Sequence, residues 1–273
     1  MSACAITLLL ALALVARAAG GAPSHGDEAL PPAVHAALAQ LAPQRPGMID
    51  LYALIVAGDG GEDVFRREAA AVQRVLDERL GTKGRSLALV NHRLSPRPEA
   101  TLKSIEFVLH AIARRMDVAE DILLLHLTSH GGSNHVLALR HPAGELYGIS
   151  PQFLRSVLDQ TRIRHRVLVI SGCYTGGFIP PLATVETMVL TAANAQRQSY
   201  GCGNDSEITE YSRALYLKAL RQTRSLREAA GVAVQLIHEY ERAHKLTHSY
   251  PQIRSGYAIE ERLRVFERQL SAP

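Results

Sequence analysis

Residues 165–178 read HRVLVISGCYTGGF, and this stretch decides the fold class. Residues 167–171 form an apolar-leaning run, VLVIS, without the polar alternation of a strand that faces water. Strands of this kind belong to parallel sheets that are covered on both faces. A lone cysteine, Cys173, follows the end of the strand and precedes a pair of glycines. Taken alone, it is either a buried packing residue or a nucleophile.

The rest of the chain repeats the alternation of apolar runs and amphipathic segments. Further strands are predicted at 48–58, 85–92, 120–132 and 186–195, and residues 133–148 predict a small hairpin. Helices are predicted at 63–81, from Pro98 onward, from Pro151 with Ser150 as cap, at 209–222, at 225–245 and more weakly at 260–270. The pattern therefore predicts an α/β fold with a mostly parallel sheet between two layers of helices.

The composition narrows the class of protein. The chain has 273 residues, of which 47% are hydrophobic and 21% charged, so it can bury a large core. The net charge of +4 is spread among both signs, and only 5% of residues are aromatic. Without a basic stripe or stacking aromatics, we expect no nucleic-acid partner.

The N-terminus predicts export. An apolar run from Ala3 to Ala16 precedes Ala16-Arg17-Ala18, which suits a signal peptide over 1–18, with an uncleaved membrane anchor as the alternative. We expect residues 19–46 to form an Ala/Pro-rich linker and residues 47–273 to form a single catalytic domain. No later run could span a membrane, so we expect a periplasmic or secreted protein. After cleavage, Cys173 and Cys202 would remain, and a bridge between them is disfavoured because it would silence Cys173.

Chemistry in such a sheet gathers beyond the carboxyl ends of the strands. His130 ends the stretch LLLHLTSH and is followed by Gly131 and Gly132, whereas Cys173 follows VLVISG. A cysteine nucleophile needs a nearby imidazole for its proton and backbone N–H groups for the developing oxyanion. We therefore predict that His130 and Cys173 form a catalytic dyad.

Other chemistries are less favoured. His126, His130, His135 and His141 lie close in sequence and leave a metal-dependent hydrolase open, but no acid or cysteine completes a compact set of ligands, and we expect no cofactor. The chain has no Gly-x-Ser-x-Gly elbow. Ile179 stands where a phosphatase-type loop would need arginine.

Three motifs in order carry a resemblance: LTSHGGSNH (127–135), VLVISGCYTGGF (167–178) and MVLTAANAQRQSYGCG (188–203). Together they resemble the bacterial branch of the legumain-type cysteine peptidases, in the caspase-like clan. The resemblance implies a three-layer α/β/α sandwich, a dyad of His130 and Cys173, and the backbone amides of Gly131 and Cys173 as oxyanion donors. It also implies that Ser199 and Tyr200 form a pocket wall, and that Cys202 is a non-catalytic loop cysteine.

Two positions depart from the family pattern. Ser171 stands where legumains that cleave after Asn carry an acid in the specificity pocket, which puts that specificity in doubt. Asp63 is the nearest counterpart of the family's helper Asn, although an acid that begins a helix explains it equally well. Ser171 and Asp63 are therefore candidate substrate-binding residues.

The sequence predicts an exported cysteine endopeptidase that acts on peptides or proteins through a thioester intermediate. Transpeptidation is chemically adjacent, because an amine can replace water in the second step. The alternative is a non-catalytic binding or scaffold domain that retains the fold.

Overall fold

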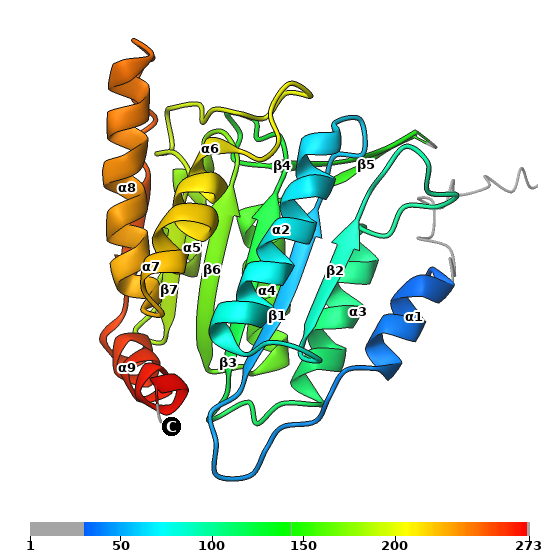
Figure 1. Cartoon of the computed structure of the whole chain (residues 1–273). Helices are drawn as coiled ribbons and strands as arrows, with labels where there is room; N and C mark the ends of the chain where they lie inside the picture. Colours follow the sequence, from blue (N-terminus) through cyan, green and yellow to red (C-terminus); the bar gives the residue numbers. More distant parts are fainter. Residues whose placement is uncertain (1–29, 143, 272–273) are drawn as a thin grey trace, which may run out of the picture.

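A six-stranded sheet forms the centre of the computed structural model, which describes residues 30–142 and 144–271. The strands are β1 (Leu51–Ala57), β2 (Ser86–Val90), β3 (Ile122–Thr128), β6 (His165–Ser171), β7 (Thr187–Thr191) and β8 (Gln252–Ser255). Their order is β2-β1-β3-β6-β7-β8, and Figure 1 shows the first five of these strands side by side. Of these six strands, only the edge strand β8 is antiparallel to its neighbour. This topology confirms the predicted mostly parallel sheet. The predicted signal peptide lies outside the described residues.

Both faces of the sheet are buried because successive strand residues point to opposite sides. Every residue of β1 and β3 is buried. In β1, Leu51, Ala53 and Ile55 pack into one hydrophobic cluster, whereas Tyr52 and Leu54 pack into the other. Each face therefore needs its own layer of helices, which gives the three-layer α/β/α sandwich.

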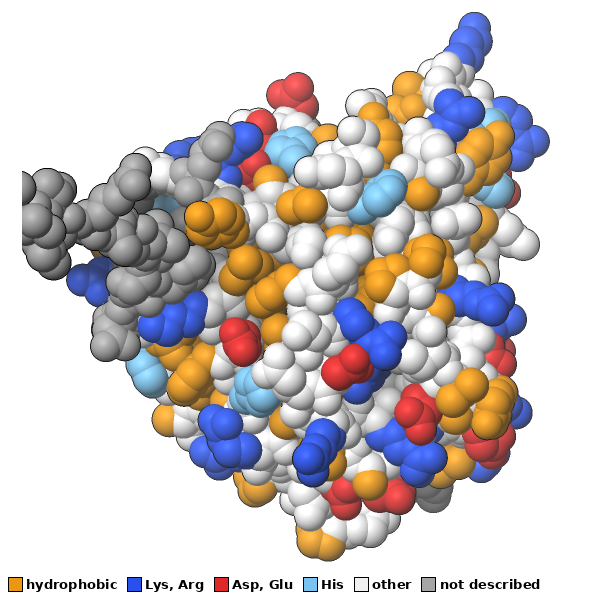
Figure 2. All heavy atoms as spheres, turned by 180° about the vertical axis from the view of Figure 1, so that it is seen from behind, with side chains coloured by type: hydrophobic (Ala, Val, Ile, Leu, Met, Phe, Trp, Pro, Cys, Tyr) orange, Lys and Arg blue, Asp and Glu red, His pale blue; other side chains and the backbone are white. Residues whose placement is uncertain are grey.

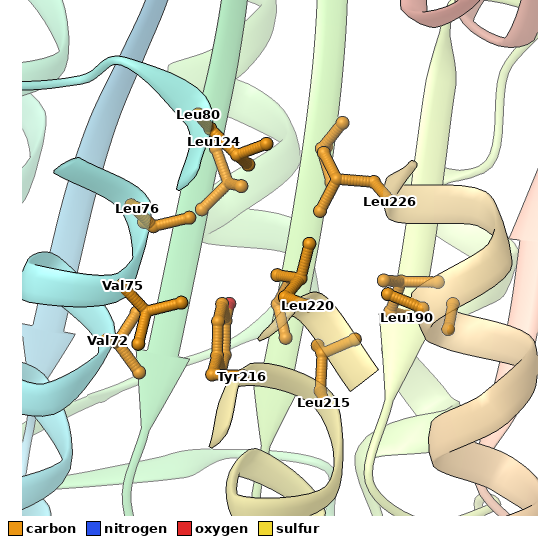
Figure 3. Close-up of a cluster of buried hydrophobic side chains, with 14 of the residues drawn as sticks. Val72, Val75, Leu76, Leu80, Leu124, Leu190, Leu215, Tyr216, Leu220 and Leu226 are labelled. Atoms are coloured by element: carbon orange, nitrogen blue, oxygen red, sulfur yellow. The ribbon is translucent and has the colours of Figure 1, made fainter. Parts of the chain in front are cut away.

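One layer consists of α2 (Asp63–Leu80), α8 (Leu226–Ala243), α9 (Tyr257–Ser271) and a helical segment between α2 and α8. That segment runs through α6 (Glu210–Ser212), a π-helical stretch (Arg213–Ala219) and α7 (Leu220–Gln222). Figure 3 shows how this layer meets the sheet through Val72, Val75, Leu76, Leu80, Leu124, Leu190, Leu215, Tyr216, Leu220 and Leu226.

The other layer contains α1 (Pro32–Ala39), α3 (Leu102–Ala113), α4 (Pro151–Thr161) and the short α5 (Ile179–Leu182). Helix α4 begins as predicted, because Pro151 opens it and the Ser150 hydroxyl accepts the Phe153 N–H at 3.1 Å. Figure 2 shows the molecule from behind, with Lys and Arg side chains interspersed among Asp and Glu. No stripe of one charge runs across the part of this face that the structure describes.

One prediction about an element is wrong, and one strand was missed. Helix α3 begins at Leu102 rather than Pro98, because the Thr101 hydroxyl caps it by accepting the Ser104 N–H at 3.0 Å. The Asn91 side chain bonds the N–H and C=O of Ala100, both at 2.9 Å, and holds that residue outside the helix. The edge strand β8 was not predicted, since its four residues are partly exposed and lack an apolar run.

The predicted hairpin is present as β4 (Leu137–His141) and β5 (Gly144–Ile149), and it lies beyond the carboxyl ends of the strands (Figure 1). Arg140 ties it to the end of β1, donating its N–H to the Gly58 carbonyl at 2.9 Å and accepting the Gly60 N–H at 2.9 Å. Within the described ranges, no helix is long and apolar enough to cross a membrane.

Candidate active site

The two candidate catalytic residues emerge from neighbouring strands. Strands β3 and β6 pair in parallel, with Thr128 opposite Ser171, so both chains leave the sheet at the same point. His130 follows β3 by two residues and Cys173 follows β6 by two residues. The structure thus brings together the two strand ends whose adjacency the sequence predicted.

The backbones of the two turns touch at Gly131. A side chain on Gly131 would collide with the Cys173 carbonyl oxygen and would place its Cβ 3.2 Å from the Cys173 nitrogen. The N–H groups of Gly131 and Cys173 donate no hydrogen bond to any group in residues 30–142 and 144–271. Two unused amide donors therefore stand side by side beside the thiol, an arrangement that suits an anionic oxygen.

The Cys173 thiol lies half-buried against the loop that follows β7. A hydrogen bond from the Cys202 thiol lowers the pKa of Cys173 to about 6. The Ser199 N–H, 3.4 Å from Sγ, and the charge of His130 act in the same direction, while burial opposes them. The hydrogen bond with Cys173 raises the pKa of Cys202, and burial acts in the same direction. Both are free thiols.

The His130 ring is partly exposed and lies edge-on against Phe65, with ring centroids 5.1 Å apart. No hydrogen bond links this ring to the Cys173 sulfur in the described part of the chain. His130 therefore lowers the pKa of Cys173 without a direct hydrogen bond to the thiol. Catalytic hydrogen bonds of this kind commonly form only in the complex with substrate.

The loop that carries Ser199, Tyr200 and Cys202 is fixed on several sides. The Tyr200 hydroxyl donates to the Thr247 carbonyl at 2.6 Å, and the Tyr200 carbonyl accepts the Glu210 N–H at 3.1 Å. Farther along, the Arg67 guanidinium of α2 donates to the carbonyls of Asn204, Ser206 and Glu207. The loop is therefore held firmly where Ser199 contacts the Cys173 sulfur.

Ser171 lies below the site rather than at its surface. Its side chain is buried, and its hydroxyl is 3.1 Å from the Thr209 hydroxyl. Thr209 in turn donates its N–H to the fully buried Glu68 at 3.0 Å, and Glu68 pairs with His126, also at 3.0 Å. A chain of buried polar groups therefore occupies the space beneath Ser171.

Sequence reasoning missed the Glu68–His126 pair, although both residues left a signal. Glu68 lies on the apolar face of α2, and His126 interrupts a strand that is otherwise apolar. The hydrogen bonds from His126, Ser212 and Thr209 lower the pKa of Glu68, against the effect of burial. Tyr216 completes the network with its hydroxyl 3.1 Å from His126 Nδ1.

Asp63, the other candidate substrate-binding residue, is already paired. One carboxylate oxygen lies 3.0 Å from His92 Nε2 and the other 3.2 Å from Arg93. The hydrogen bond from His92 and the charge of Arg93 lower its pKa. The Asp63 N–H also donates to the Asn204 side chain at 3.0 Å, so this residue helps to hold the loop of Ser199 and Tyr200.

A groove of about 360 Å³ opens on the other side of His130, between its turn and the hairpin. Its walls include Gly131, Asn134, Val136 and Arg140. The four histidines near this region do not converge: His126 binds Glu68, His135 the Tyr174 carbonyl and His141 the Ser95 carbonyl. Across the described residues, no three His, Cys, Asp or Glu side chains are grouped so as to hold a metal ion.

The fold and the paired strand ends define a caspase-like α/β protein. The structure is similar to a crystal structure of caspase-1 from Spodoptera frugiperda, with a TM-score of 0.54 and 15% sequence identity over 76% of this chain and 86% of that chain. At this identity the match shows the fold alone. A search of curated proteins found no match.

Residues 110–267 match the Peptidase C13 family, the legumain family, and this span contains both His130 and Cys173. The chain belongs to this family. It is thus a cysteine peptidase of the caspase-like clan, as the three sequence motifs predicted, and its expected partners are peptides or proteins.

Proposed function

We propose that the protein is an endopeptidase in which Cys173 is the nucleophile and His130 handles the proton. The Cys173 thiolate attacks the carbonyl carbon of a peptide bond, and the carbonyl oxygen becomes negatively charged. His130 then protonates the leaving nitrogen, the C–N bond breaks, and a thioester remains on Cys173. Water, deprotonated by His130, attacks the thioester and releases the acid and the free thiol.

One observation carries this proposal: the unused N–H groups of Gly131 and Cys173 stand together beside a thiol with a lowered pKa. Two aligned amide donors are the arrangement that stabilises a tetrahedral oxyanion. A cysteine that served only for packing would have a raised pKa, because burial disfavours the thiolate.

The substrate-binding roles follow the placement of each candidate. Ser199 and Tyr200 are proposed as the wall for the residue before the scissile bond, because their loop contacts the Cys173 sulfur directly. Ser171 acts on that pocket only from below, through Thr209. Asp63 stays a prediction, since its carboxylate already pairs with His92 and Arg93.

Cleavage of a peptide library tests this function. Wild-type protein should cut peptides, while Cys173→Ser and His130→Gln should lose at least about 1,000-fold in kcat/KM. His110→Gln, on helix α3, is the matched control and should behave as wild type. Unchanged cleavage by Cys173→Ser would refute the proposal. Adding an amine nucleophile to the same assay measures transpeptidation, which we propose as the competing outcome for the thioester.

Export is proposed on the sequence of the first 18 residues alone. Expression of the full chain, with sequencing of the mature N-terminus, tests whether cleavage follows Ala18. A mature chain that still began at Met1 in the cytoplasm would contradict it.

A non-catalytic scaffold is the second candidate, favoured by Ser171 in place of a pocket acid. That reading predicts that a peptidyl electrophile fails to label Cys173. It also predicts that the rate of thiol alkylation is the same in wild type and in His130→Gln.

A further inference from the structure

His135 links the turn that carries His130 to the turn that carries Cys173. Its Nδ1 atom lies 2.9 Å from the Tyr174 carbonyl oxygen. The ring also rests directly on Gly177, where any side chain would overlap it. Because a carbonyl oxygen only accepts hydrogen bonds, Nδ1 must carry the proton.

On its own side, His135 belongs to a tightly bonded turn. Its N–H donates to the Gly132 carbonyl at 2.9 Å, and the Ala138 N–H donates to the His130 carbonyl at 2.8 Å. His135 has a positive φ of 61°, which a non-glycine residue adopts only where its surroundings hold it. The ring is therefore attached to the backbone that positions His130.

On the opposite side, the bonded residue is the one that follows the nucleophile. Tyr174 has a positive φ of 59°, a left-handed conformation that is strained for a non-glycine residue. Its N–H donates to the Arg197 carbonyl at 2.7 Å, and its carbonyl accepts His135 Nδ1–H at 2.9 Å and, more weakly, the Gly177 N–H at 3.3 Å. These bonds hold both ends of Tyr174 and fix the peptide that leaves Cys173.

We propose that His135 is a positioning residue that holds the Cys173 amide in register with the Gly131 amide and His130. This proposal deepens the proposed peptidase function and rests on it. Without the bond to Tyr174, the Cys173 turn can relax from its left-handed conformation and misalign the pair of amide donors. Misplacement of about 1 Å at a reacting centre costs about 100-fold in rate.

Two isosteric variants separate positioning from packing. In His135→Asn, the side-chain NH₂ can take the place of Nδ1–H, whereas in His135→Gln it takes the place of Nε2. We expect kcat to fall about 10- to 100-fold in His135→Gln with KM within about threefold of wild type, and to recover in His135→Asn. Melting temperatures of both variants show that each is folded.

Equal loss of kcat in the Asn and Gln variants would overturn the proposal, because the ring would then matter only as packing. The ¹⁵N chemical shifts of the wild-type His135 ring show which ring nitrogen carries the proton, and this measurement does not depend on enzymatic activity. We expect the proton on Nδ1. A ring protonated only on Nε2 also overturns the proposal. A wild-type protein that cleaves no peptide would instead refute the proposed function, while the ring shifts would still decide whether the link to Tyr174 exists.

Discussion

Replacement of Cys202 by alanine tests the origin of the low thiol pKa at the site. The hydrogen bond from Cys202 is the largest cause that lowers the pKa of Cys173 to about 6. At pH 6, about half of the Cys173 thiol is then ionised in wild type. Cys202→Ala removes this donor and leaves the Ser199 N–H in place, 3.4 Å from the sulfur.

The size of the effect follows from the strength of the lost bond. A hydrogen bond to a charged group is worth about 1.5–3 kcal/mol, which is about a 10- to 150-fold change in the acid dissociation constant. At pH 6 the fraction of Cys173 present as thiolate would fall about 5- to 75-fold. Because both thiols are only half-buried, water replaces part of the lost hydrogen bond, and we expect this fraction to fall about 5- to 20-fold.

The assay is the pH dependence of alkylation by iodoacetamide, with mass spectrometry to locate the label on Cys173. Alkylation of Cys202→Ala should be about 5- to 20-fold slower than wild type at pH 6 and should match it near pH 10. Cys202→Ser keeps an O–H donor and should restore most of the rate at pH 6. An unchanged pH midpoint in Cys202→Ala would refute this explanation of the low pKa.

Three further predictions concern the amide pair and buried titratable groups. Gly131→Ala should lower kcat at least about 100-fold in peptide cleavage while Cys173 alkylation continues. Burial lowers the pKa of His165, so the unfolded chain binds more protons, and stability should fall as pH drops below about 6.5. Urea titrations at pH 7.5 and 5.5 measure how much the free energy of unfolding falls between the two pH values. His165→Leu should make that fall smaller by up to about 1 kcal/mol. Glu68→Gln breaks a buried pair and should cost about 3 kcal/mol in urea unfolding, whereas the exposed Glu120→Gln should cost under about 0.5 kcal/mol.

The sheet was predictable because its central strands are buried on both faces, which leaves largely apolar runs at 122–128 and 167–171. The edge strand β8 carries no such signal, since only one of its faces packs against the protein. The start of α3 was misplaced because Pro98 satisfies a local rule, while the side chain of Asn91, just after β2, holds Ala100 outside the helix. Sequence patterns mispredict the end of an element where a side chain from elsewhere fixes the backbone conformation.

The placement of His130 and Cys173 was predictable for a similar reason: parallel strands end at one edge of a sheet, and the strands before these two residues are neighbours. The partners that tune the site come from loops. No spacing rule places the Cys202 thiol against Cys173 or the His135 ring against the Tyr174 carbonyl. The burial of Ser171 likewise depends on Thr209, which is 38 residues away.

The central claim is that Cys173 forms a thioester with the acyl part of a peptide. Acid quenching during turnover, followed by intact mass measurement and peptide mapping, tests it directly. We predict an added mass equal to the acyl fragment on Cys173 in wild type and none in Cys173→Ser. Continued peptide cleavage with no acyl adduct on Cys173 at any time point would contradict the account.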